Sequence, residues 1–262
     1  MIKLNTIVTQ IKWASLCLIM CFSSTLMAKT YSENFAVESG GTLDIKTDIG
    51  AIEIRTHQKS SIELILKVES DDEDKFRYQT EQSGGNLSIT GKLASGNRWG
   101  NNLRVQFELI IPEHYNINLQ TSAGSLNIAD LNGQVNARTS GGSIRVGNIV
   151  GDVELNTSGG SISTAAITGN VNAHTSGGSI NVIINKQPSA DSKLSTSGGS
   201  ITAELIKDIE IDLYASTSGG RVKTDFEVDG SIKKQSIKGK INGGGPRLTL
   251  TTSGGSIRIN SL

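Results

Sequence analysis

The sequence predicts an all-β fold, a single-stranded parallel β-helix or β-solenoid with about eighteen residues per coil, built from two nine-residue half-repeats. A glycine followed two residues later by a branched aliphatic residue recurs every nine residues between Gly124 and Gly178. Only every second block ends in Thr-Ser-Gly, as at 139–141 and 157–159, so two blocks form one unit. Apolar and polar side chains alternate within each block, which is typical of a strand with one buried face.

An antiparallel meander or sandwich of short strands would show the same nine-residue period. The solenoid is favoured because the two half-repeats keep distinct identities. Each half-repeat also runs from aliphatic residues to a corner in the same direction, which suits successive walls of a right-handed coil. No stretch after residue 28 shows the period of a helix.

Residues 1–28 are expected to form a secretory signal peptide that is cleaved after Ala28. Lys3 and Lys12 precede an apolar run at 13–22, and small and polar residues follow it. A membrane anchor is the alternative, but the apolar run is about half of the roughly 20 residues that cross a bilayer. The mature protein is therefore expected in the periplasm or at the cell surface, without a transmembrane segment.

Cysteine and charge restrict the chemistry of the exported chain. Cys17 and Cys21 both lie in the signal segment, so the remainder has no thiol or disulfide. Lipid attachment at Cys21 is disfavoured by the bulky Met20 before it. Removal of two lysines leaves 23 basic and 25 acidic side chains, a net charge of −2. This near-neutral charge argues against nucleic acid as a partner.

Residues 29–262 are predicted to form a single β-solenoid domain. Weak copies of the repeat begin at Gly41 and Gly50. Residues 60–118 contain longer alternating runs, which we expect to form longer strands as antiparallel excursions or as a cap over one solenoid end. Residues 119–262 hold the regular coils, with repeated Thr-Ser-Gly-Gly-Ser-Ile. Late copies are spaced by 21 residues, and the extra residues are expected to bulge at a corner that contains Pro188.

Stacked coils should place like positions in ladders inside the solenoid. One predicted ladder is Val135, Val153 and Val171, and a second is Leu126, Ile144, Ile162 and Ile180. A third, of Thr139, Thr157 and Thr175, should face inward, with its hydroxyls bonding along the stack or to the turn backbone. Glycine pairs follow these threonines, and we expect them to adopt positive φ at sharp corners.

The sequence offers no constellation of residues that marks a catalytic or metal site. Calcium-binding β-rolls need Gly-Gly-x-Gly-x-Asp loops, and the equivalent loops here carry no carboxylate. The acidic run at 71–74 is interpreted as solvated charge in a loop. His57, His114 and His174 stand in unrelated contexts without metal-ligand spacing. We therefore expect no metal, no cofactor and no catalytic residue.

Two stretches resemble the bacterial putative-adhesin family of envelope proteins. Residues 105–126 combine an alternating strand ending in Pro112, a short link and a first Thr-x-x-Gly-x-Leu unit, and residues 239–257 end in Thr-Ser-Gly-Gly-Ser-Ile. The resemblance covers essentially the whole exported chain. It implies a repeat-containing β-solenoid of unknown function at the cell envelope, and no catalytic residues come with it.

The leading functional hypothesis is an exported, non-enzymatic β-solenoid that presents a repetitive polar surface to an envelope protein or glycan, for adhesion or binding. Outward positions are the candidate surface contacts: Arg138, Arg145, Glu154, His174 and Arg221. One alternative is a carbohydrate-active β-helix enzyme, which would need a groove lined by three or more convergent acidic and basic side chains. Another is a periplasmic structural or stress-response component that uses the same scaffold.

Overall fold

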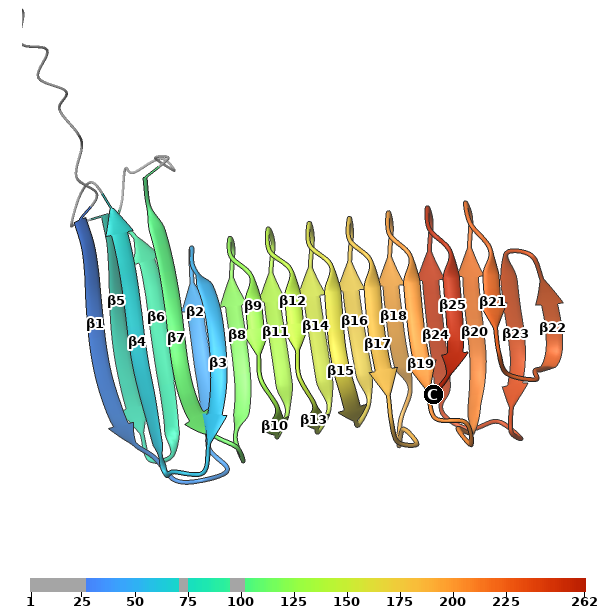
Figure 1. The fold of residues 1–262 in the computed structure, drawn as a ribbon, viewed down its shortest axis with the longest axis horizontal. Helices are drawn as coiled ribbons and strands as arrows, with labels where there is room; N and C mark the ends of the chain where they lie inside the picture. Colours follow the sequence, from blue (N-terminus) through green and yellow to red (C-terminus); the bar gives the residue numbers. More distant parts are fainter. Residues whose placement is uncertain (1–26, 71–74, 95–101) are drawn as a thin grey trace, which may run out of the picture.

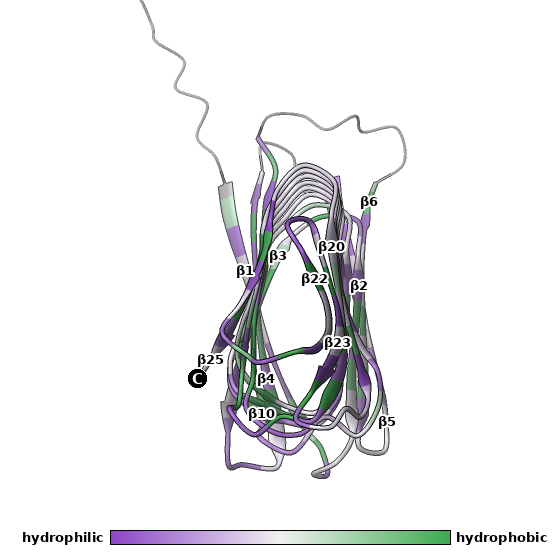
Figure 2. Ribbon diagram, turned by 90° about the vertical axis from the view of Figure 1, so that its right-hand side faces the viewer, coloured by the Kyte–Doolittle hydropathy of each residue, from purple (hydrophilic) through white to green (hydrophobic). Residues whose placement is uncertain are grey.

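The computed structural model describes residues 27–70, 75–94 and 102–262, and its regular elements are strands. They form a thirteen-stranded sheet, here called sheet A, and a twelve-stranded sheet, here called sheet B. The two sheets face each other along the long axis of the molecule, as Figures 1 and 2 show. The predicted all-β class is confirmed, and the open, mostly parallel sheets are consistent with a solenoid.

The repeat region contributes one strand to each sheet in turn. We call such a pair of strands a layer. In sheet B the first strands are β8 (Asn116–Thr121), β11 (Val135–Thr139), β14 (Val153–Thr157), β16 (Val171–Thr175) and β18 (Ser192–Thr196). Their partners in sheet A are β9 (Leu126–Ile128), β12 (Ile144–Val146), β15 (Ile162–Thr168), β17 (Ile180–Ile184) and β19 (Ile201–Leu205), with the short β10 (Leu131–Asn132) and β13 (Ile149–Val150) beside them.

Like positions stack in parallel register from layer to layer, as predicted. Val135 pairs with Val153, and Val153 pairs with Val171. These valines are at most 2% exposed. The second ladder, of Leu126, Ile144, Ile162 and Ile180, is fully buried on the opposite sheet. The core is therefore a narrow stack of aliphatic side chains between the two sheets. Each layer buries its apolar surface against its neighbours.

The three extra residues of one late copy fit at a corner without changing the core register. Ile180 of β17 pairs with Ile201 of β19, and Thr175 of β16 pairs with Thr196 of β18, although both pairs are 21 positions apart. The connection from β17 to β18 contains Pro188, as the sequence predicts.

A threonine that ends the sheet B strand of each Thr-Ser-Gly-Gly repeat faces inward and bonds to the turn of a neighbouring layer. The Oγ1 of Thr139 donates to the carbonyl oxygen of Gly124 at 2.9 Å, and Thr157 Oγ1 donates to that of Gly142 at 2.7 Å. The same bond recurs at Thr175, Thr196, Thr217 and Thr252. These bonds satisfy buried backbone groups at the corner, and the prediction of inward hydroxyls is confirmed.

The prediction of positive φ at the glycine pairs is wrong. None of the six pairs, from 141/142 to 254/255, belongs to the glycines with positive φ. The second glycine is needed for another reason, because a Cβ at Gly142 or Gly160 would overlap the backbone carbonyl of the glycine one layer below. The first glycine has room in the early pairs, since a Cβ at Gly141 would meet its nearest atom at 3.8 Å, whereas a Cβ at Gly219 would meet one at 2.9 Å. Close stacking of the turns, and not turn conformation, selects glycine there.

The N-terminal region has longer strands. These are β1 (Met27–Ala36), β2 (Thr42–Thr47), β3 (Ala51–His57), β4 (Ser61–Ser70), β5 (Phe76–Ser83), β6 (Asn86–Leu93) and β7 (Arg104–Pro112). The β2–β3 layer lies in parallel beside β8–β9, and β6–β7 lies in parallel outside it. Antiparallel β4 and β1 extend sheet A, and antiparallel β5 extends sheet B.

Contacts between the two outermost strands close the N-terminal end. The rings of Tyr31 in β1 and Tyr78 in β5 meet edge to face with centroids 5.1 Å apart. The Tyr78 hydroxyl donates to Glu33 Oε1 at 2.6 Å, and burial together with this bond raises the pKa of Tyr78. Side chains that cross from one sheet edge to the other protect the end of the core.

The C-terminal layers do not follow chain order, which corrects the expectation that successive copies stack in sequence. The remaining strands are β20 (Ile211–Thr217), β21 (Val222–Thr224), β22 (Asp229–Lys233), β23 (Ser236–Ile241), β24 (Arg247–Thr252) and β25 (Ile257–Ser261). The last layer, β24–β25, lies between β18–β19 and β20–β21, where Figure 1 shows it in red. The antiparallel hairpin β22–β23 pairs with β20 and forms the end of sheet B.

Two predicted segments fall mostly or wholly outside the described residues. Of the predicted signal peptide at 1–28, only the last two residues are described, and they begin β1 by pairing with Ser70 and Glu69. The acidic run at 71–74 also lies outside the described residues. Across the part of the chain that is described, we find no helix with the length and apolarity needed to cross a membrane.

Candidate binding surface

The outer face of sheet B carries rows of polar side chains that cross successive strands. Because β8, β11, β14 and β16 are in parallel register, Asn118, Asn136, Glu154 and Asn172 form one row. Asn116, Gln134, Asp152 and Asn170 form a second row at the strand starts. Both rows line a groove of about 600 Å³, here called the amide groove.

The second row of the amide groove ties one layer to the next. Asn116 Oδ1 accepts a hydrogen bond from the backbone N–H of Gln134 at 2.9 Å, and Asp152 Oδ1 accepts one from the N–H of Asn170 at 3.0 Å. Asn170 Oδ1 accepts from Ala190 N–H at 2.8 Å, and Asp191 Oδ1 accepts from Arg247 N–H at 2.8 Å. The groove therefore has a rigid floor, because its side chains are held by backbone groups.

Three of the five predicted contact residues share the outer face of sheet B. Arg138 of β11 lies 2.5 Å from Glu154 Oε1 of β14 and also donates to Asn136 Oδ1 at 3.2 Å. Glu154 Oε1 accepts a further bond from Asn156 Nδ2 at 3.2 Å. His174 of β16 pairs in register with Asn156, and its Nδ1 is 2.9 Å from Ser195 Oγ. These side chains form a connected polar surface next to the amide groove.

The other two predicted residues lie elsewhere. Arg145 belongs to β12 of sheet A, so it faces outward on the opposite side of the molecule. Arg221 precedes β21 near the C-terminal end, where its backbone N–H donates to Ser256 Oγ at 3.3 Å. The structure does not bring all five residues together, because successive half-repeats alternate between the two sheets.

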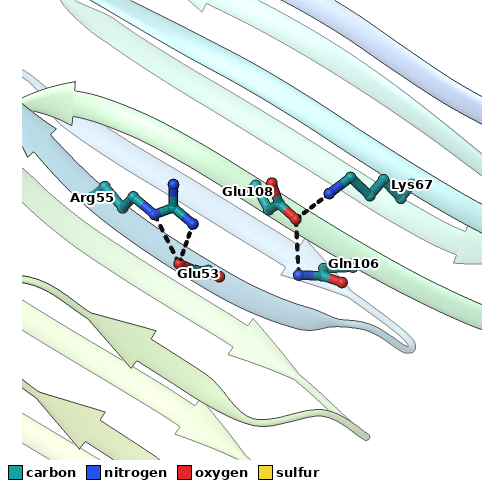
Figure 3. A network of polar contacts seen from close by, with 5 residues as sticks. All are labelled: Glu53, Arg55, Lys67, Gln106 and Glu108. Atoms are coloured by element: carbon teal, nitrogen blue, oxygen red, sulfur yellow. Dashed lines mark hydrogen bonds and ion pairs between the residues drawn. The ribbon is translucent and has the colours of Figure 1, made fainter.

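Sheet A carries a polar network that the sequence did not indicate. Figure 3 shows Arg55 bonded to Glu53 at 2.7 Å, and Lys67 bonded to Glu108 at 2.5 Å with Gln106 donating to the same carboxylate at 2.9 Å. The bond to Glu53 raises the pKa of Arg55. These charges neutralise one another on an exposed face, so they add little to stability.

A second groove on sheet B, of about 780 Å³, lies over the C-terminal strands and is here called the terminal groove. Its charged and aromatic lining comes from four strands: Asp212 and Tyr214 of β20, Asp229 of β22, Lys238 and Lys240 of β23, and Arg247 of β24. No pattern in the sequence brings these residues together. The only signal in the sequence was an isolated tyrosine at an outward position of a strand.

Hydrogen bonding lowers the pKa of one carboxylate, which lies at a corner of the layers. Asp130 accepts bonds from the side-chain and backbone N–H groups of Asn148, both at 2.8 Å, and these hold the pKa of Asp130 below its usual value. Within the described residues, no group of three or more His, Cys, Asp or Glu side chains has an arrangement that could hold a metal ion.

This fold and these surfaces define the class of the protein. It is an all-β repeat protein with polar grooves on a flat sheet. The sequence model of the Toastrack DUF4097 family matches residues 41–167 and again residues 113–260, so the chain belongs to this family. This family match bears out the resemblance, noted from the sequence, to a family of unknown function.

Similar solved structures were found at low sequence identity. A putative cell adhesion protein from Clostridium sporogenes is 16% identical, with 89% of this chain and 100% of that chain covered and a TM-score of 0.39. A putative adhesin from Bacteroides fragilis is 11% identical, with 89% and 97% covered and a TM-score of 0.33. One from Parabacteroides merdae is 12% identical, with 89% and 96% covered and a TM-score of 0.25. A search of the curated proteins found no significant match.

Proposed function

We propose that this chain is an exported, non-enzymatic β-solenoid of the cell envelope whose sheet B face binds a protein or glycan partner. The observation that carries the proposal is the amide groove, in which equivalent polar side chains repeat on four neighbouring strands. Strands in a sheet are about 4.8 Å apart, so the groove repeats its hydrogen-bonding groups at that interval. Such a surface suits a partner that is itself extended or repetitive.

The arrangement favours binding over catalysis. The groove positions amide and carboxylate groups as a periodic row with a rigid floor, which is suited to recognition along a length of partner. Catalysis instead needs several groups aimed at one reacting atom. Of the five predicted contact residues, we propose that Arg138, Glu154 and His174 contribute directly, since they lie on the same face as the groove.

The proposal includes the location and the extent of the protein. We propose that residues 1–28 direct export and are removed, and that residues 29–262 act as one solenoid domain with eighteen-residue coils in the periplasm or at the cell surface. The eighteen-position register of Val135, Val153 and Val171 supports the coil size. Cell fractionation with protease accessibility of the intact cell tests the location.

Capture of a partner from envelope fractions tests the binding face. Residues 29–262 serve as bait, and Asn172→Arg places a long side chain in the amide groove. Asn181→Arg is the matched control, because Asn181 is also exposed and lies in the following strand on the opposite sheet. We expect the wild type and Asn181→Arg to recover the same partner and Asn172→Arg to lose it. Equal recovery by all three proteins would refute a role for the groove.

The terminal groove favours a second candidate function, a carbohydrate-active enzyme. More than three acidic and basic side chains line it, which is one part of the condition set for that alternative. Incubation of the protein with acidic oligosaccharides, followed by mass spectrometry, tests this candidate. Shortened products that disappear in Asp212→Asn would establish the enzyme in place of the binding protein.

A further inference from the structure

The charges of the terminal groove form alternating rows across four strands. Strand pairing places Arg247, Asp212, Lys240 and Asp229 side by side on β24, β20, β23 and β22. The next outward row contains Tyr214, which lies between Thr249 and Lys238. Side chains that are distant in sequence thus meet on one face, because β24 is inserted beside β20 and the hairpin folds back on β20's other edge.

The acidic and basic side chains of the terminal groove do not form ion pairs with one another. Among the described residues, no ion pair within 4.0 Å joins Asp212 or Asp229 to Lys238, Lys240 or Arg247. In contrast, the carboxylates of Glu53, Glu108 and Glu154 on the outer faces are each paired with a basic side chain. The terminal groove therefore offers three cations and two carboxylates to a ligand.

One carboxylate oxygen of Asp212, Oδ1, is buried and has no hydrogen-bond partner in the described part of the chain. Gly244, with φ of +86°, lies so close that a Cβ there would be 2.6 Å from this oxygen. A buried oxygen without a hydrogen-bond partner costs stability. Because Oδ1 is buried, a ligand hydroxyl in the groove would bond to the other oxygen of Asp212, and Asp212 lines the groove.

Tyr214 gives the groove an aromatic surface. Its side chain is 40% exposed and is one of the few large hydrophobic residues that the described structure leaves open to solvent. A flat ring beside unpaired carboxylates and cations is suited to a ligand with an apolar face, hydroxyl groups and a negative group. A volume of about 780 Å³ lies within the range of small-ligand sites.

We propose that the terminal groove binds a carboxylate-bearing sugar of an acidic glycan. Lys238, Lys240 and Arg247 receive the carboxylate, Asp212 and Asp229 accept hydrogen bonds from sugar hydroxyls, and the sugar ring packs on Tyr214. A simple inorganic anion is disfavoured because it would leave Asp229 and Tyr214 without a partner. The inference rests on the proposed binding role of sheet B and assigns one of its ligands.

Titration calorimetry with trigalacturonate tests the proposal. The fully methyl-esterified trisaccharide keeps the rings and the remaining hydroxyls but removes the charge, and triglutamate keeps the charge without a sugar. We expect residues 29–262 to bind trigalacturonate about tenfold more tightly than the ester, since charge-assisted hydrogen bonds are the stronger ones. Undetectable binding of trigalacturonate, equal binding of the ester, or tighter binding of triglutamate overturns the proposal.

Four variants separate the parts of the site. Arg247→Gln should weaken binding of trigalacturonate and leave the ester unaffected, whereas Tyr214→Ala should weaken both. Lys223→Gln is the control, because this exposed lysine lies on β21 of sheet A. Asn172→Arg should leave trigalacturonate binding unchanged while envelope capture is lost. If Tyr214→Ala and Arg247→Gln leave trigalacturonate binding unaltered, and both proteins show unchanged thermal unfolding, the assignment of the ligand to the terminal groove is overturned. Envelope capture tests the proposed function separately from this result.

Discussion

Thr196 pairs in register with Thr252, and not with Thr217, which is the next copy of the repeat along the chain. Thr217 in turn pairs with Thr252 from the other side. The β20–β21 layer therefore does not lie directly beside the β18–β19 layer. The last layer of the chain, β24–β25, lies between them, and the β22–β23 hairpin pairs with the other edge of β20. Stacking of the C-terminal layers thus depends on contacts between residues far apart in sequence.

Engineered disulfides should report this order of layers. Ser195 and Thr251 are direct neighbours on the outer face, and Ser216 lies on the far side of Thr251. Adjacent strands are about 4.8 Å apart, which a disulfide can span, whereas two strand spacings exceed its reach of about 7 Å between Cα atoms. We expect Ser195→Cys with Thr251→Cys to form a disulfide, detected by mass spectrometry of unreduced peptides.

The matched control is Ser195→Cys with Ser216→Cys, and it should remain reduced. Residues 29–262 contain no other cysteine, because Cys17 and Cys21 lie before residue 29. Cross-linking of this control pair in place of the first would mean that the copies stack in chain order.

Glycine pairs at the corners should differ sharply in their tolerance of alanine. A Cβ at Gly160 would overlap the carbonyl of Gly142, whereas a Cβ at Gly159 would meet its nearest atom at 3.6 Å. We expect Gly160→Ala to lower the free energy of unfolding by at least about 2 kcal/mol, because the layers must separate. Gly159→Ala should change it by less than about 0.5 kcal/mol. Urea unfolding midpoints measure both, and similar losses would show that close stacking is not the cause.

Thr157 should stabilise its corner through its hydroxyl group. The Oγ1 donates to Gly142 O at 2.7 Å and accepts from Gly160 N–H at 3.4 Å. Thr157→Val keeps the shape of the side chain but leaves both backbone groups without a partner in a buried corner. We expect a loss of about 1–3 kcal/mol in the free energy of unfolding.

Ser158→Ala is the control for that substitution, because Ser158 is exposed and adjacent. It should change the free energy of unfolding by less than about 0.5 kcal/mol. If valine at 157 and alanine at 158 had the same small effect in urea unfolding, the threonine ladder would be a packing feature alone.

The features that the sequence predicted are those that a single repeat determines. Alternation within nine residues identifies which side of each strand is buried, and the eighteen-residue period identifies the residues that share a ladder, such as Val135 and Val153. Both depend only on near neighbours in the chain. The inward face of Thr139 follows from the same alternation.

The features that the sequence missed depend on contacts between layers. Copies that share one motif can pair with any other copy, so nothing in the sequence shows that Thr252 lies beside Thr196. The terminal groove depends on that order, since Arg247 lies beside Asp212 only because β24 is inserted there. The sequence suggests turn conformation as the role of the glycine pairs, because the close approach of their backbones arises only when two layers stack.

Acid should weaken the corner where Asp130 meets Asn148. The side-chain and backbone N–H groups of Asn148 bond to the ionised carboxylate and lower its pKa in the folded protein. The unfolded chain has an ordinary Asp pKa of about 3.9, so these bonds favour folding fully above that pH. Their contribution is lost as the pH falls from there through the lower folded pKa, because protonation then costs the folded state more.

Substitution of each partner distinguishes this carboxylate from other acids that titrate in the same range. Asp130→Asn cannot ionise, so the free energy of unfolding should fall less between pH 5 and pH 3 than in the wild type, by urea unfolding at each pH. Asn148→Ala should return the Asp130 pKa towards its usual value in an NMR titration of the carboxyl group. This variant also loses the bond from Ala166 N–H to Asn148 Oδ1, so the titration is its decisive readout. An Asp130 titration unchanged by Asn148→Ala would mean that another group lowers the pKa.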